Sequence, residues 1–223
     1  MANRAAKENG ANLTPEEEEE VKERSTPRAA VVYETVREEG EQELIRPVEA
    51  LIFSGLAAGL SMGFSLVAQG LLTAHLPDSD WRPLLAKFGY SAGFLIVVLG
   101  RQQLFTENTL TVIAPLLQNG TLTTLLPEIQ VWGVVLVSNL VGTLAFAWVI
   151  AHTNVFEPEI KRVFSEIGYE VAVQGSWSTL FIRGIFAGWL IAMMVWLLPA
   201  AESARIWVII IMTYLVAIGG YTH

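Results

Sequence analysis

His223 is the polar residue whose type and position best suit chemistry in apolar surroundings, because it follows two glycines at the end of an apolar segment. An unperturbed imidazole has a pKa of roughly 6.5, so it can exchange a proton near neutral pH. Such a side chain at membrane depth indicates a proton step or a polar pathway. Two other interpretations stay open: a packing histidine bonded to a neighbouring carbonyl, or one exposed at the chain end.

A second group of polar residues, Thr106, Glu107 and Asn108, interrupts the apolar stretch between residues 88–100 and 110–117. Their hydroxyl, carboxylate and amide could satisfy loose backbone groups or face an ion. Glu107 could instead lie at a membrane interface, where a carboxylate costs little.

The sequence contains no soluble-type catalytic constellation. We find no His-Glu-x-x-His motif, no phosphate loop and no Gly-x-Ser-x-Gly elbow. An intramembrane hydrolase would need a positioned nucleophile, and His223 has no evident serine partner. We therefore do not predict an enzyme, and we expect no cofactor and no metal.

The composition indicates an integral membrane protein. Hydrophobic residues make up 52% of the 223 residues and charged residues only 16%, against roughly 25% in soluble domains. Residues 1–49 hold 20 of the 36 charged side chains, so the remainder is too apolar for a solvated surface. The absence of cysteine excludes a disulfide scaffold, and the net charge of -8 disfavours nucleic-acid binding.

Three apolar runs are long enough to cross a membrane, which takes about 20 helical residues. They are residues 50–74, 129–151 and 177–198, and the last contains one charge, Arg183. Asn139, in the second of these runs, is predicted to make an interhelical hydrogen bond. Residues 206–221 form a further run that reads as an unfinished span.

The stretch from residue 88 to 117 is predicted to be a discontinuous span, because two short apolar halves flank a polar interruption. Broken backbone is tolerated at membrane depth only where protein or a watery cavity satisfies it. The alternatives are a re-entrant hairpin or two interfacial segments joined by a polar turn.

Weak internal symmetry supports the discontinuous span. Residues 53–59 (Phe-x-Gly-Leu-Ala-Ala-Gly) resemble residues 182–188 (Ile-x-Gly-Ile-Phe-Ala-Gly), and an interrupted segment follows each. This arrangement is typical of a transport site at a repeat interface. Gly55, Gly59 and Gly63 also form a smooth helical stripe for close packing, inside the protomer or between protomers.

Several short motifs in residues 45–223 resemble the formate/nitrite transporter family. They are Leu104-Phe105-Thr106, Asn139-Leu140-Val141-Gly142, Arg183-Gly184-Ile185 and the Gly-x-x-His ending at His223. The string that begins Arg101-Gln-Gln-Leu-Phe-Thr-Glu-Asn-Thr is similar to a less characterised inner-membrane branch.

The resemblance implies an all-α, aquaporin-like inverted-repeat bundle with broken helices two and five, assembled as a homopentamer with one pore per protomer. Six spans are expected, of which about four and a half are present here. We expect a disordered acidic cytoplasmic tail at 1–27, an amphipathic interfacial helix at 28–47, and the transmembrane channel domain at 48–223. The implied location is the cell inner membrane, and Arg37 and Arg46 favour a cytoplasmic N-terminus.

The resemblance also implies passage of small monovalent anions, such as formate, nitrite or hydrosulfide, past hydrophobic constrictions around a central histidine that polarises or protonates them. Protons, these inorganic or monocarboxylate anions and the lipid bilayer are then the expected partners, with no nucleic acid. Carried over residue by residue, the pore and anion-binding positions are His223, Thr106, Tyr90, Phe94, Leu104, Phe105, Val216, Gly188 and Asn139. Among them, the positions that match the family's hydrophobic constrictions are Tyr90, Phe94, Leu104, Phe105 and Val216.

Three departures from the family pattern limit what the resemblance implies. In one of them, Tyr90 and Phe94 enlarge or polarise positions that are often held by smaller or plainer residues. Gly188 stands where the family usually has an asparagine that faces the histidine, and a lysine often found before span four has no match near Ala172. Gly188 and the expected stop within the fifth span motivate the alternative hypothesis, a non-conducting structural or regulatory membrane protein that retains the fold.

Overall fold

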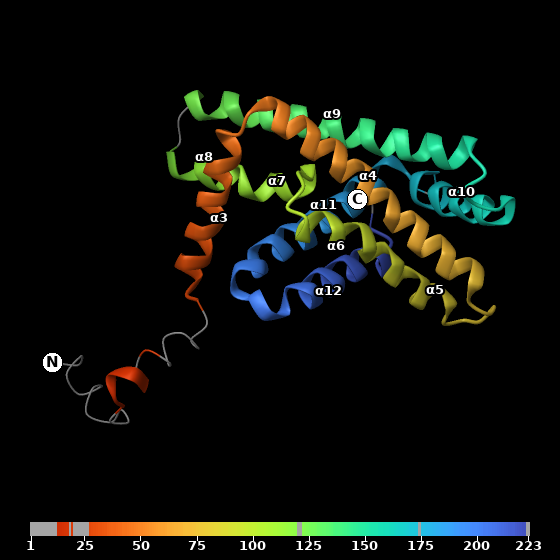
Figure 1. Ribbon diagram of the computed structural model, residues 1–223, viewed down its shortest axis with the longest axis horizontal. Coiled ribbons are helices and arrows are strands. Elements are labelled where there is room, and N and C mark those ends of the chain that lie inside the picture. Colours follow the sequence, from red (N-terminus) through yellow and green to blue (C-terminus); the bar gives the residue numbers. More distant parts are fainter. Residues whose placement is uncertain (1–12, 18, 20–26, 120–121, 174, 222–223) are drawn as a thin grey trace.

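The computed structural model describes residues 13–17, 19, 27–119, 122–173 and 175–221, and these form a helical protein (Figure 1). The α-helices are α3 (Ala29–Leu44), α4 (Val48–His75), α5 (Arg82–Ala86), α6 (Ser91–Leu99), α7 (Phe105–Thr111), α8 (Ile113–Asn119), α9 (Leu122–His152), α10 (Pro158–Val173), α11 (Trp177–Leu197) and α12 (Arg205–Ile218). Short 3-10 helices are η1 (Lys87–Tyr90), η2 (Leu198–Ala200) and η3 (Glu202–Ala204).

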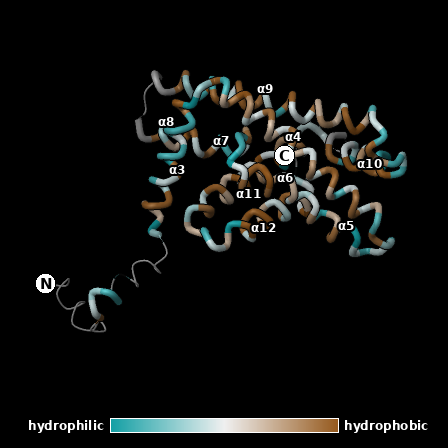
Figure 2. Tube along the Cα trace, viewed as in Figure 1, coloured by the Kyte–Doolittle hydropathy of each residue, from teal (hydrophilic) through white to brown (hydrophobic). Residues whose placement is uncertain are grey.

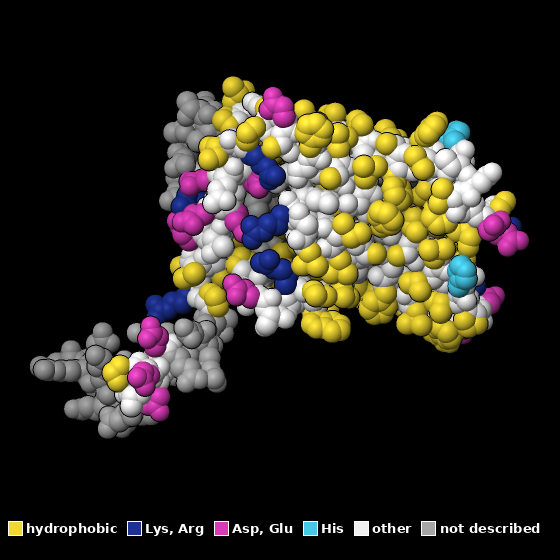
Figure 3. Space-filling model, viewed as in Figure 1, with side chains coloured by type: hydrophobic (Ala, Val, Ile, Leu, Met, Phe, Trp, Pro, Cys, Tyr) yellow, Lys and Arg dark blue, Asp and Glu magenta, His cyan; other side chains and the backbone are white. Residues whose placement is uncertain are grey.

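An apolar band separates two charged ends of the molecule. Hydrophobic residues dominate the helices in its middle (Figure 2), and on the face shown in Figure 3 charged side chains gather near α3 and at the opposite end. Four helical segments of the described chain are long and apolar enough to cross a membrane: Val48–His75, Arg82–Leu99, Leu125–His152 and Trp177–Ala200. The predicted all-α membrane fold is confirmed, and the second span begins six residues earlier than expected.

The glycine stripe of α4 packs inside the chain, against α9. A Cβ atom added to Gly59 would lie 2.3 Å from the backbone oxygen of Asn139, and one added to Gly63 would lie 2.1 Å from the Phe146 ring. On the α9 side of the contact, a Cβ added to Gly142 would lie 2.5 Å from the backbone oxygen of Leu56 in α4. Only glycine permits this approach, and helix pairs in membranes gain stability from such close contact.

The second span is discontinuous, as predicted. Helices α5, α6, α7 and α8 follow one another in one direction in Figure 1, which excludes the hairpin alternative. The position of the interruption differs from the prediction: the non-helical residues are 100–104, so Thr106 lies in the first turn of α7 and not in the loop. The helix resumes early because a distant side chain caps it, as described below.

The second half of the chain repeats the arrangement of a long span followed by a short helix, with α11 and α12. Helix α12 has 14 residues, about 21 Å at 1.5 Å per residue, and is too short to cross a hydrocarbon core of roughly 30 Å. It packs against α6, where the hydroxyls of Ser91 and Thr213 are hydrogen-bonded at 2.8 Å. The two short helices therefore meet at the centre of the bundle.

Helix α3 forms within the region predicted to be an amphipathic helix, and one side of it is fixed to the bundle. Val32, Val36 and Gly40 are buried, and a Cβ on Gly40 would lie 1.9 Å from the backbone oxygen of Thr111 at the end of α7. Its position at a membrane surface stays a prediction.

Most of the predicted tail, residues 1–27, lies outside the described residues. Residues 15–17 and 19 are helical, and the disorder predicted for the tail stays a prediction. This helix begins with a capping box between Thr14 and Glu17, whose backbone and side-chain hydrogen bonds lower the pKa of the Glu17 carboxyl.

Candidate functional site

The interruption of the second span begins with a helix end that bends the chain sharply. The Gln102 N–H donates to the Val97 carbonyl at 3.0 Å and the Arg101 N–H to Val98 at 3.2 Å. Arg101 has a φ of 49°, the left-handed conformation that glycine usually supplies at this position. The strain of placing an arginine there is of order 1 kcal/mol, and it fixes the direction in which the loop leaves the helix.

Asn139 of α9 holds the non-helical residues in place. Its Oδ1 accepts the Phe105 N–H at 2.9 Å, and its Nδ2 donates to the carbonyls of Gln103 at 2.9 Å and Gly55 at 2.8 Å. The hydroxyl of Ser54 accepts the Gln103 N–H at 3.0 Å. The side chains of α4 and α9 thus satisfy backbone groups that no helix satisfies, which is the condition for broken backbone at membrane depth.

The interhelical hydrogen bond predicted for Asn139 is therefore confirmed, and its amide also caps α7. Because all three of its hydrogen bonds go to the backbone, these contacts are structural. A direct contact with an anion stays a prediction.

The first turn of α7 carries a second polar layer. The Asn108 Nδ2 donates to the Gln103 side chain at 2.8 Å, and the Trp132 indole donates to the Asn108 carbonyl at 3.1 Å. These contacts join the loop, α7 and α9 into one unit.

Buried polar atoms without a hydrogen-bond partner gather around the interruption. Among the described residues, four of the six such atoms are Gln102 Oε1, Thr106 Oγ1, Glu107 Oε1 and Arg205 Nε, and the other two belong to Glu128. Native proteins pair nearly all buried polar groups with protein or ordered water. Because these unpaired atoms are concentrated here, the interruption is a place where water or a polar solute can form hydrogen bonds with the protein.

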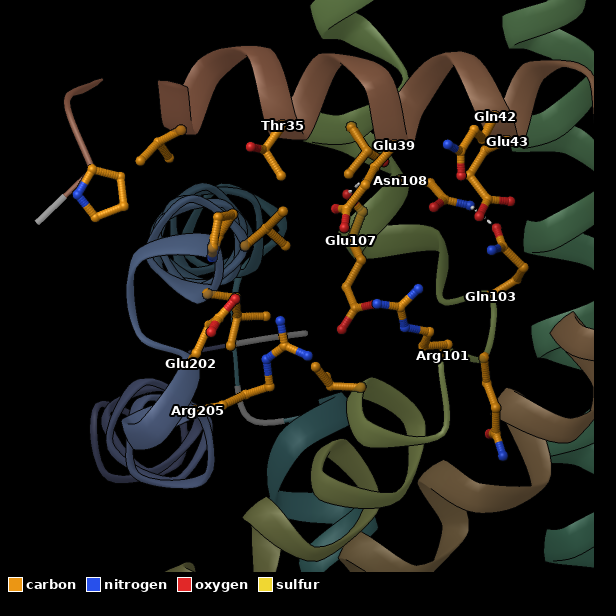
Figure 4. A pocket seen from close by; sticks show the side chains of 18 of the residues that line it. Thr35, Glu39, Gln42, Glu43, Arg101, Gln103, Glu107, Asn108, Glu202 and Arg205 are labelled. Atoms are coloured by element: carbon orange, nitrogen blue, oxygen red, sulfur yellow. Dashed lines mark hydrogen bonds between the residues drawn. The ribbon is translucent and has the colours of Figure 1, made fainter. Parts of the chain in front are cut away.

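A cavity of about 430 Å³ is lined by three of these residues, Gln102, Glu107 and Arg205, and lies between α3, the interrupted segment, α7 and the junction of α11 with α12. Figure 4 shows the guanidinium groups of Arg101 and Arg205 and the side chain of Glu107 directed into it. Within the described chain, neither arginine forms an ion pair. Both charges are available to a solute.

Four of the predicted constriction residues, Tyr90, Phe94, Leu104 and Val216, belong to one hydrophobic cluster. Phe94 and Val216 are completely buried, and the Tyr90 and Phe94 rings lie 5.4 Å apart. The cluster fills the space among α4, α6, α11 and α12 and includes one residue of the loop, Leu104. Its arrangement is that of a dry barrier, although the same packing serves an ordinary core.

The structure separates the remaining predicted site residues. Phe105 packs in another cluster with Leu51 and Val112, and no described atom lies within 4 Å of a Cβ placed on Gly188. His223 lies outside the described residues, so its predicted role is untested.

The second interruption is visible up to Tyr221 and repeats the first. The Tyr221 N–H donates to the Val216 carbonyl at 3.1 Å, the Gly220 N–H donates to Ala217 at 3.2 Å, and Gly220 has a φ of 61°. The hydrogen-bond spacing matches that of Gln102 and Arg101. The predicted internal symmetry therefore extends to the geometry of the two helix ends.

Sequence reasoning did not place Arg205, Glu202 and Glu39 at this site. A charge at the start of the otherwise apolar fifth span was the available signal for Arg205. Glu39 reaches the cavity only because α3 docks on α7, and no local pattern announces that contact.

Comparison with known proteins gives a consistent family. Residues 30–223 match the family model described as formate/nitrite transporter. The chain is 45% identical over 196 residues to inner membrane protein YfdC of Escherichia coli (strain K12), which covers 88% of this chain and 63% of that protein. It therefore spans less than two thirds of this relative's length.

A formate-nitrite transporter of Plasmodium vivax is 28% identical over 125 residues, covering 52% of this chain and 39% of that one. Two solved structures share the fold at 20% identity. A pentameric formate channel with formate bound superposes with a TM-score of 0.68, covering 79% of this chain and 70% of its own. An ion channel of the same family gives 0.61, with 87% and 76% coverage.

Proposed function

The chain belongs to the formate/nitrite transporter family, and we propose that it forms a pore for small monovalent anions of the formate, nitrite or hydrosulfide class. The observation that carries this proposal is the interrupted second span. Its backbone is held open by Asn139 beside a polar cavity that contains two arginines without an ion pair among the described residues.

The proposed path runs from the cavity at the α3 side into the hydrophobic cluster. A guanidinium attracts an anion and offers several N–H donors to it. The cluster beyond excludes water, so a bare anion enters it at high cost, whereas the corresponding neutral acid passes more cheaply. A pore of this kind selects weak acids that can change their charge on the way.

His223 is proposed to lie beyond the cluster and to polarise or protonate the passing anion, as the family resemblance implies. The repeated geometry supports this position: the second helix end has the same bonds as the first, and His223 follows it by two residues. The Thr106 hydroxyl, which has no described partner, is proposed to face the same path.

The assembly and orientation are also proposals. One structural neighbour is a pentameric formate channel, which supports a homopentamer with one pore per protomer. The relative YfdC is an inner membrane protein, which supports that location. We propose that α3 and the cavity face the cytoplasm.

Flux measurements test the anion pore. Proteoliposomes that contain the full-length protein should take up formate, nitrite or hydrosulfide faster than protein-free liposomes. His223→Ala should slow the uptake at least about tenfold if the imidazole supplies a proton or a hydrogen bond in the passage. Uptake equal to that of empty liposomes would refute the pore.

The second candidate function is a non-conducting membrane protein, favoured by Gly188, whose side of α11 is open in the described chain. If the protein is non-conducting, the parent protein should show no anion flux. Gly188→Asn, which restores the residue usual in the family, should then produce flux. Flux in the parent protein would exclude this alternative.

A further inference from the structure

Glu107 is an acid inside the proposed pore. It lies in the first turn of α7, three residues after the capping residue Leu104, and its side chain lines the cavity. Its Oε1 is buried and has no hydrogen-bond partner in the described chain. Figure 4 shows its side chain directed into the cavity. An ionisable side chain in such a position is more often functional than structural.

The charged groups around Glu107 come from every element that borders the cavity. Helix α3 supplies Glu39 and Glu43, the interrupted segment supplies Arg101, η3 supplies Glu202, and α12 supplies Arg205. Glu43 is occupied by an ion pair with Arg46 at 3.2 Å. The two guanidiniums form no ion pair within the described chain and share the cavity with Glu107, so an anion drawn to them arrives beside its carboxyl group.

A purely structural role would explain only part of this arrangement. An acidic residue in the first turn of a helix is stabilised by the helix dipole, and Glu49 in the first turn of α4 is a second example in this chain. The dipole accounts for an acid at this position. It does not account for a carboxyl oxygen left without a partner and directed into a polar cavity at the edge of the dry cluster.

Resting on the proposed function, we infer that Glu107 is a proton-transfer residue that neutralises the anion before it enters the hydrophobic cluster. The O–H bond of the Glu107 carboxylic acid breaks as an O–H or S–H bond forms on the anion, and no electrons are gained or lost. The neutral acid moves on, and the Glu107 carboxylate recovers a proton from hydronium in the cavity. Transport in the other direction reverses these steps.

The test compares the parent protein with Glu107→Gln in proteoliposomes, at pH 7 and pH 5. We expect the variant to take up formate at least about tenfold more slowly at pH 7, because a positioned acid contributes roughly 10²-fold or more. The difference should shrink at pH 5, because the neutral fraction of a weak acid rises about tenfold for each pH unit of acidification. Glu107→Asp should recover part of the flux at pH 7.

Glu49→Gln is the matched control, because Glu49 occupies the first turn of another helix and lies outside the cavity. Its flux should equal that of the parent at both pH values. A flux deficit in Glu107→Gln that is the same at pH 7 and pH 5, or no deficit at all, would overturn the inference while leaving the anion pore standing. Absence of flux in the parent itself would refute the proposed function, and this inference with it.

A measurement on the unmodified protein covers the case in which Glu107→Gln does not fold. A hydrophobic carbodiimide reacts with protonated carboxyl groups in apolar surroundings. It should modify Glu107, as detected by peptide mass spectrometry, and reduce formate flux in step with the modification. Full modification without loss of flux, or no modification of Glu107, would contradict the inference.

Discussion

Helices α6 and α12 end with the same set of backbone hydrogen bonds, but the chain holds the two ends differently. After α6, the left-handed residue is Arg101, and Asn139 from α9 binds the residues that follow it. After α12, the left-handed residue is Gly220. The first end therefore needs support for a strained arginine, whereas the second uses a residue that adopts this conformation without strain.

The same contrast appears in the long span that precedes each of these helices, α4 in the first repeat and α11 in the second. Gly59 of α4 is pressed against the backbone of α9, whereas its counterpart Gly188 of α11 has no described atom within 4 Å of an added Cβ. Local residues thus produce the helix ends in both repeats. A neighbouring helix that holds the end rigid is described only for the first repeat.

The largest expected effect comes from adding one methyl group at Gly59, where α4 contacts the backbone of α9. Gly59→Ala should destabilise the fold by about 3 kcal/mol, because the obstructing atom is a backbone oxygen that cannot rotate away. Gly188→Ala is the matched change and should stabilise α11 by about 0.5 kcal/mol through helix propensity. Detergent-titrated unfolding, followed by tryptophan fluorescence, measures both. Equal effects at the two glycines would remove the distinction between the repeats.

A smaller effect is expected when the side chain that caps α7 is removed. Asn139→Ala leaves the Phe105 N–H and the Gln103 carbonyl without their partner. It should lower the free energy of unfolding by about 2 kcal/mol. A single hydrogen bond between membrane helices contributes roughly 0.6 kcal/mol, and the unpaired groups add to the loss. Asn154→Ala, at an exposed loop position, is the control and should stay within about 0.5 kcal/mol of the parent.

Hydrogen exchange sharpens the meaning of that result. In Asn139→Ala the amide of Phe105 should exchange faster while the amides of α4 stay protected. Uniform loss of protection would mean that Asn139 stabilises the bundle as a whole and not the interruption.

The spans and the discontinuity of the second one could be predicted from the sequence, because both depend on local runs of apolar residues. The exact position of the interruption could not, since Asn139 lies 34 residues from the Phe105 amide that it caps. The cavity was also beyond local patterns, because its walls include Glu39 and Arg205 from opposite ends of the chain. The constriction residues were identified by resemblance, and the structure brings four of them together without testing their role.

Cysteine accessibility tests most directly whether the interrupted second span borders water inside the bilayer. The chain has no cysteine, so Gln102→Cys introduces a single thiol beside the cavity, and Leu144→Cys introduces one on the exposed apolar face of α9. In membranes, a charged, water-soluble thiol reagent should modify Gln102→Cys at least about tenfold faster than Leu144→Cys, because only a hydrated thiol ionises and reacts. Excess formate should slow the reaction at residue 102. Equal, slow modification of both thiols would contradict the account, since the interruption would then be dry.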